Sequence, residues 1–180
     1  LTPVPLFDMV DGATEVFDAA EDGYWSDASQ AAAETADAWD AFSAGQVPPL
    51  IRDRMTEKLN LFEDAVAARD AGEARRAALE VMLSAYALQL RHRPVPPIDI
   101  ARLRIRACVL VLDAEDEDAG AALGDVVVLE WIRDRIAHTL STLDARTLNR
   151  QIRSIRTEIE RERLGAARRI AEQICDQIDG

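Results

Sequence analysis

Apolar residues recur every three to four positions through most of the chain, which is the period of an amphipathic helix. This pattern predicts helices over residues 11–43, 50–69, 73–91 and 126–143. Pro48 and Pro49 separate the first from the second, and proline suits the opening turn of a helix. Gly72, between the second and third, allows either a tight hairpin or a kink in one long rod. The chain is therefore predicted to be all-α.

The last predicted helix begins at a capping box. In "STLD", Ser141 stands three residues before Asp144, so that the serine hydroxyl can accept a hydrogen bond from the first turn. Apolar residues then continue at helical spacing to Ile178, and a helix of that length extends roughly 50 Å at 1.5 Å per residue. Such a rod either braces the bundle or pairs with a second subunit, so a homodimer through the C-terminal helix is one expectation.

The segment "RLRIRACVLVL", residues 102–112, has two interpretations. Its apolar and arginine positions alternate as in a strand, yet Ile100, Leu103 and Ala107 also share one helical face. The strand would have only "DVVVLEWI" as a partner, and an isolated two-stranded hairpin is marginally stable. We therefore expect a helix here. The predicted architecture is a single domain, residues 1–180, folded as an antiparallel bundle of four to six helices with a long C-terminal helix.

A run of acidic residues in "LDAEDEDAGAALGD", residues 112–125, suggests a calcium loop. An EF-hand needs glycine at its sixth position and glutamate at its twelfth. Counted from Asp113, these positions hold Asp118 and Gly124, and the register from Asp116 fails at both positions as well. The stretch is therefore predicted to be a solvated turn between helices.

The charge of the chain limits its partners. The net charge is −12, which argues against nucleic acid because phosphate binding relies on a basic surface. The first 51 residues hold ten acidic side chains and no Lys or Arg. This segment either complements the arginine-rich C-terminal part or forms an acidic face for cations or a basic partner. No apolar run of 18 or more residues occurs, so no transmembrane segment is expected.

The N-terminal segment and the cysteines bear on the compartment. The chain opens with "LTPVPLFD", which resembles the start of a chain from which a signal peptide or lipoprotein anchor has been removed, and equally the start of a domain fragment. An extracytoplasmic location, whether periplasmic, secreted or lipid-anchored, is the expectation, with a cytoplasmic one as the alternative. Cys108 and Cys175 lie in apolar helical patterns, where a buried free thiol is the usual interpretation and a disulfide the alternative.

One group of residues has the spacing of a metal site. Glu130, Asp134 and His138 succeed each other at four-residue intervals, so one helical face offers two carboxylates and an imidazole to an ion. The competing interpretation is a set of surface pairs, Glu130 with Arg133 and Asp134 with His138. Only two histidines occur in the chain, and no Glu-x-x-His pair of a di-iron bundle is present.

His92 lies between Arg91 and Arg93 at the end of a predicted helix. Cations there suit the terminal carbonyl groups. The alternative interpretation is a basic cluster for an anionic ligand.

The aromatic residues are the best candidates for a binding surface. Tyr24 and Trp25 are neighbours in sequence, so they point about 100° apart on a helix and one of them is expected at a rim or groove. Tyr86 and Trp131 complete the candidate ligand-binding set, and Arg135 can stack on Trp131. Core packing is the competing interpretation, and an aromatic-lined cleft between helices is the functional one.

Residues 62–92 resemble the small b-type four-helix cytochromes, in which a Gly-interrupted, Ala-rich helical segment ends in a Tyr-His haem ligand. Ala87 comes after Tyr86 where that family has the histidine. The resemblance implies bundle packing, without the axial ligand at that position.

Motifs for nucleophilic or nucleotide chemistry are absent: no G-x-S-x-G, Walker loop, G-x-G-x-x-G or C-x-x-C occurs. We therefore expect a non-enzymatic helical binding or interaction module, exported, with a protein partner or small ligand; the sequence does not identify a cofactor. Two alternatives are a periplasmic bundle that handles a metal or cofactor and the ligand-binding or dimerisation domain of a cytoplasmic regulator.

Overall fold

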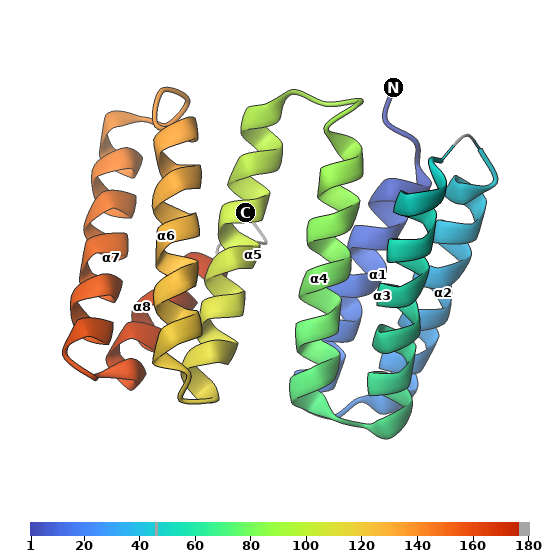
Figure 1. The fold of residues 1–180 in the computed structure, drawn as a ribbon, viewed down its shortest axis with the longest axis horizontal. Coiled ribbons are helices and arrows are strands. Elements are labelled where there is room, and N and C mark those ends of the chain that lie inside the picture. The colour runs from blue at the N-terminus through green and yellow to red at the C-terminus, as the bar shows by residue number, and fades with distance from the viewer. Residues whose placement is uncertain (46, 177–180) are drawn as a thin grey trace. The chain divides into compact units, whose positions relative to one another are not determined.

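The computed structural model describes residues 1–45 and 47–176, and this part of the chain is helical with no strand. Within it lie the eight helices of Figure 1: α1 (Pro5–Asp22), α2 (Trp25–Ser43), α3 (Pro49–Ala68), α4 (Ala71–Gln89), α5 (Val95–Glu115), α6 (Ala119–Ile136), α7 (Thr142–Glu160) and α8 (Leu164–Cys175). The all-α prediction is confirmed, whereas the prediction of four to six helices is wrong. Two of the expected long helices are each divided by a turn.

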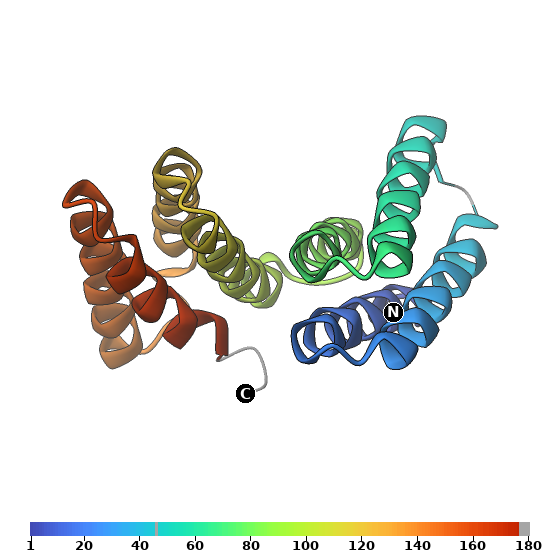
Figure 2. The same cartoon turned by 90° about the horizontal axis from the view of Figure 1, so that it is seen from below.

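The helices form two compact units, Leu1–Arg93 with α1 to α4 and Pro94–Gly180 with α5 to α8, here called the N-unit and the C-unit. In Figure 2 the N-unit runs from blue to green and the C-unit from yellow to red. Each unit has the same connectivity: its first helix packs against its second and fourth, and its third against its second and fourth. The single domain over residues 1–180 stays a prediction, because two compact units can belong to one domain or to two.

The predicted helix over residues 11–43 is wrong, because a turn at Gly23 separates α1 from α2. Gly23 has a φ of 77°, and its N–H group donates to the carbonyls at the end of α1. This left-handed conformation favours glycine. The apolar spacing continues across the turn, so periodicity alone did not reveal it.

The C-terminal rod predicted from Ser141 to Ile178 is also wrong, and residues 177 and 178 lie outside the described residues. The capping box is confirmed, since Ser141 Oγ accepts a hydrogen bond from the Asp144 N–H at 3.1 Å. However, α7 ends at Glu160 and α8 begins at Leu164. In the turn between them, Glu162 has a φ of 58°. A long dimerising rod is therefore not formed, and a homodimer stays a prediction without that support.

The helix predicted over residues 126–143 is too long, because α6 ends at Ile136 and α7 begins at Thr142. The two remaining helix predictions are confirmed. The helix over residues 50–69 is α3, and the one over 73–91 is α4. The turn between them lies at Arg69, which has a φ of 55°, and Asp70 then caps α4 by accepting a hydrogen bond from the Glu73 N–H. Gly72 thus lies inside α4, and the joint is a turn between two helices.

The ambiguous segment 102–112 lies within α5, so the helix prediction is confirmed there. The acidic stretch after it forms the turn between α5 and α6. Asp118 accepts a hydrogen bond from the Ala121 N–H at 2.9 Å and so caps α6. Asp125 is buried on α6 rather than exposed at the start of a helix. Over the described residues, no helix is long and apolar enough to cross a membrane.

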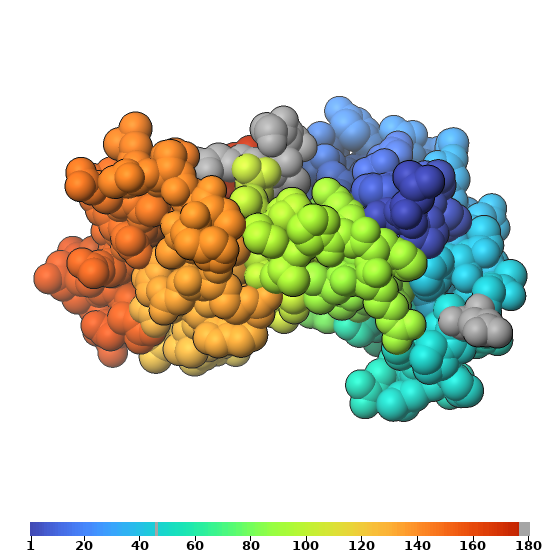
Figure 3. Space-filling model, turned by 90° about the horizontal axis from the view of Figure 1, so that it is seen from above, coloured from blue at the N-terminus to red at the C-terminus, as the bar shows by residue number. Residues whose placement is uncertain are grey.

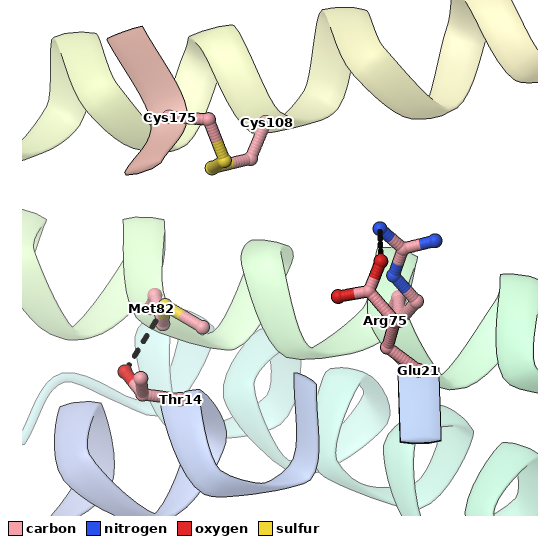
Figure 4. The surroundings of a disulfide bond; sticks show 6 residues. All are labelled: Thr14, Glu21, Arg75, Met82, Cys108 and Cys175. Atoms are coloured by element: carbon pink, nitrogen blue, oxygen red, sulfur yellow. Dashed lines mark hydrogen bonds and ion pairs between the residues drawn. A yellow bond between two sulfur atoms is a disulfide. The ribbon is translucent and has the colours of Figure 1, made fainter. Parts of the chain in front are cut away.

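Contacts along the whole length of α1 hold it against α4 in the N-unit. Glu21 pairs with Arg75 at 3.3 Å, and Thr14 Oγ1 donates to Met82 Sδ at 3.7 Å, as Figure 4 shows. At the other end, the fully buried Gln89 donates from Nε2 to the Leu6 carbonyl at 3.0 Å. These three contacts fix the antiparallel register of the two helices.

Helices α1 and α2 approach each other closely at Gly12. A Cβ atom built on Gly12 would lie 2.3 Å from Thr35 Oγ1 and 3.1 Å from the Ala31 carbonyl oxygen. Thr35 is fully buried, and its hydroxyl donates to that same carbonyl. A glycine inside a helix is destabilising by itself, so its place here is explained by the contact with α2.

We expect Gly12→Ala to lower the unfolding free energy of the N-unit by about 2 kcal/mol, because the added methyl group overpacks a rigid contact. Thr35→Ala in the same chain should recover part of this loss, since it removes the nearest atom. Urea unfolding followed by circular dichroism measures both changes. Gly124→Ala on α6 is the matched control, because a Cβ there meets no atom within 4 Å, and helix propensity alone should make it neutral or stabilising. Equal effects of the two alanines would contradict this account.

A disulfide between Cys108 on α5 and Cys175 on α8 crosslinks the C-unit (Figure 4). The expectation of two buried free thiols is therefore wrong. The sequence placed both cysteines in apolar helical patterns, but only the packing of α8 on α5 brings their Cα atoms to 5.1 Å, within the range that a disulfide spans. The core around them is built mainly from aliphatic residues of all four helices.

Candidate functional site

The aromatic residues predicted to form a binding surface belong to different units. Tyr24 lies in the turn between α1 and α2 and is 61% exposed, and Trp25 begins α2. Tyr86 lies on α4 of the same unit. Trp131 lies on α6 of the C-unit and is 59% exposed.

Within the N-unit, the structure does not bring Tyr86 together with Tyr24 and Trp25. The turn that carries Tyr24 comes after the end of α1, where Glu21 contacts Arg75 on α4. Tyr86 comes eleven residues after Arg75 on the same helix, which is about 16 Å along the axis at 1.5 Å per residue. A single cleft lined by all three side chains is therefore not formed in this unit.

Trp131 takes part in a stack with an arginine, as the sequence predicts. The Arg135 guanidinium lies 4.5 Å from the centroid of the Trp131 ring. Its Nη2 also donates to Oδ2 of Asp99 on α5, a side chain that is only 1% exposed. Arg102 Nη1 lies 3.8 Å from the other oxygen, Oδ1, which accepts no hydrogen bond within the described part of the chain. Arg135 thus contacts both the exposed Trp131 ring and the buried carboxylate of Asp99.

The three residues with the spacing of a metal site, Glu130, Asp134 and His138, do not come together around a common point. Asp134 pairs with its neighbour Arg133 at 2.7 Å, and His138 lies beyond Ile136, where α6 ends. Glu130 binds Arg156 on α7. Among the residues that the structure describes, no group of three or more His, Cys, Asp or Glu side chains is arranged to hold a metal ion. Glu130, Asp134 and His138 therefore do not form a preformed metal site.

The Glu130 pair links α6 to α7 and depends on pH. Arg156 donates from Nε and Nη2 to the two carboxylate oxygens, at 3.0 and 2.7 Å. These hydrogen bonds lower the pKa of Glu130 from its ordinary value, against the opposing effect of partial burial. The folded pKa therefore lies below the unfolded one, and the pair stabilises the C-unit fully above the ordinary carboxyl range. That stabilisation is lost as the pH falls through the lowered pKa.

A pocket of about 440 Å³ lies at one end of the N-unit. It is bounded by the beginnings of α1 and α3 and the ends of α2 and α4. Figure 3 looks onto these helix ends, where the N-terminal residues (dark blue) lie against the end of α4 (green). The walls are apolar, and two basic residues that come after α4 also line it; the lining includes Phe42, Val47, Ile51, Leu88, Arg91 and His92. We call it the N-unit pocket.

A pocket of about 520 Å³ lies at the equivalent end of the C-unit. Its lining comes from the beginnings of α5 and α7, the end of α6 with the residues after it, and the end of α8. The walls are again mostly aliphatic, with polar groups among them; they include Leu103, Arg104, Ile136, Leu148, Asp144 and Ile174. We call it the C-unit pocket. Both volumes fall in the range of small-molecule sites, which are mostly apolar with a few polar groups.

The sequence identified only some of the residues that line these pockets. It singled out the basic residues around His92, but it assigned the apolar wall residues to the core. The signal it lacked was the repeated connectivity, because the two units share no recognisable period in sequence. No protein-family model, curated protein or solved structure matches this chain.

Proposed function

We propose that this chain is a non-enzymatic helical binding module that acts outside the cytoplasm and holds small apolar molecules. The observation that carries the proposal is the repeated pocket. In each unit an apolar pocket lies where the first and third helices begin and the second and fourth end. The two pockets thus occupy the equivalent place in the shared helix connectivity of the two units.

Two further observations support the proposal. The Cys108–Cys175 disulfide fits an oxidising compartment such as the periplasm or the exterior, because thiols are kept reduced in the cytosol. The pocket walls also consist mainly of side chains that cannot act as nucleophile, acid or base, and the sequence lacks the G-x-S-x-G motif of a serine nucleophile. Binding is thus a better fit to these pockets than catalysis.

A neutral apolar dye tests the proposal. N-phenyl-1-naphthylamine should bind to the oxidised full-length chain with about two sites, seen as an increase in its fluorescence. Ala41 is exposed and lines the N-unit pocket, so Ala41→Trp should fill that pocket and remove about one site. Thr147 lines the C-unit pocket, and Thr147→Trp should remove the other.

Two further tryptophan substitutions, of an alanine and a threonine outside the pockets, control for the effect of introducing a tryptophan. Ala67 is exposed on α3 and Thr157 is partly buried on α7. Ala67→Trp and Thr157→Trp should leave both sites intact, with helicity by circular dichroism unchanged in all four variants. Absence of dye binding, or equal losses in the pocket and control variants, would rule out the two-pocket function.

A further inference from the structure

The N-unit pocket combines apolar walls with two basic side chains. Arg91 and His92 come just after the end of α4 and line the pocket, and both are exposed. Neither side chain makes a hydrogen bond or ion pair within the described part of the chain. Among the described residues that line the pocket none is acidic, although the chain as a whole has a net charge of −12. The guanidinium of Arg91 is therefore a positive charge without a neutralising partner beside an apolar space.

A hydrogen-bonded network holds the end of α4 in place next to this pocket. Buried Gln89 donates to the Leu6 carbonyl, and its Oε1 accepts from Arg93 Nη1 at 2.9 Å. The Arg93 guanidinium also lies 5.5 Å from the centroid of the Phe7 ring. Arg93 therefore makes structural contacts within the N-unit, whereas the side chains of its neighbours Arg91 and His92 are available to a ligand. The basic run thus divides into one structural residue and two residues at the pocket.

The charge pattern differs between the two pockets. The lining of the C-unit pocket includes Asp144 as well as Arg104, so a positive and a negative group are both present. The described lining of the N-unit pocket has basic residues and no acid. An arginine with free N–H groups recognises a carboxylate through two parallel hydrogen bonds. Selectivity for an anion is therefore expected in the N-unit pocket alone.

We propose that the N-unit pocket binds a small monocarboxylate with an apolar tail. The carboxylate pairs with Arg91, with His92 beside it, and the tail contacts Phe42, Val47, Ile51 and Leu88. This assignment rests on the proposed binding function and adds the chemical class of the ligand.

Three ligands with eight carbons each test the assignment on the oxidised full-length chain: octanoate, 1-octanol and octylamine, measured by displacement of N-phenyl-1-naphthylamine. The Thr147→Trp background isolates the N-unit pocket. Octanoate should bind about tenfold more tightly than octanol, as one charge-assisted pair at a partly exposed site allows, and octylamine should bind least. Arg91→Gln should reduce octanoate to the affinity of octanol and leave octanol unchanged.

Arg54→Gln provides the matched control, because Arg54 is exposed on α3 and lies outside the pocket lining. It should leave the preference for octanoate intact. If octanoate and octanol bind equally, or if both arginine variants act alike, the assignment of an anion fails while the dye result still supports the binding function. If the dye itself does not bind, the binding function fails and the assignment with it.

Discussion

Replacing both cysteines with alanine, Cys108→Ala with Cys175→Ala, should lower the unfolding free energy of the C-unit by about 4 kcal/mol. The disulfide closes a loop with a sequence separation of 67 residues, and a crosslink of that span restricts the unfolded chain by about this amount. Without it α8 is held by three buried side chains, Ala167, Ala171 and Ile174, and by the partly buried apolar residues beside them.

The same change should affect one pocket and not the other. Ile174 precedes Cys175 and forms part of the C-unit pocket, so loosening α8 removes a wall from that pocket. Dye binding should fall from about two sites to about one, and Ala41→Trp in the same chain should remove the remaining site. The N-unit pocket thus serves as an internal control.

Urea unfolding with and without a phosphine reductant measures the effect on stability. Trp131 is the only tryptophan after residue 93, and its fluorescence in a variant with Trp25 and Trp39 replaced by phenylalanine reports on the C-unit. Reductant should lower the midpoint of the native chain and leave the double alanine variant unchanged. An unchanged midpoint in the reduced native chain would contradict a stabilising disulfide.

Arg135→Met should cost the C-unit about 3 kcal/mol, because it leaves the carboxylate of Asp99 buried without its hydrogen-bonding partner. Asp99 is 1% exposed, and the remaining cation, Arg102, lies 3.8 Å away. Asp99→Asn should cost less. It leaves Arg135, whose side chain is 33% exposed, and that guanidinium can turn towards water.

A double-mutant cycle separates the buried charge from lost packing. Asp99→Asn combined with Arg135→Met should be more stable than Arg135→Met alone, because the uncompensated charge is gone. Arg133→Met, two residues away, is the matched control. It breaks a pair with Asp134, which is 70% exposed and therefore stays solvated without its partner, so the lost pair should contribute within about 1 kcal/mol. Equal losses from Arg133→Met and Arg135→Met, measured by urea unfolding, would contradict the role assigned to Asp99.

The success of the sequence predictions depended on whether a feature is local. The capping box at Ser141, the helix over residues 102–112 and the stack of Arg135 on Trp131 each depend on residues within a few positions of one another, and all three are present. The predicted partners of Glu130 and Asp134 were also sought on their own helix. Asp134 does pair locally, with the adjacent Arg133. Glu130 instead binds Arg156, which lies 26 residues further along the chain, a contact that helix spacing does not encode.

The amino-acid sequence alone determined the all-helical class of this protein, its acidic charge and most of its amphipathic faces, because these depend on spacing and composition. It also contained the glycine that ends α1, although uninterrupted apolar periodicity concealed it. Tertiary structure decided the division into two units, the pairing of Cys108 with Cys175, the burial of Asp99 and the position of both pockets. Each of these joins residues far apart in the chain, and which helix faces meet is set by packing over the whole unit rather than by any local pattern.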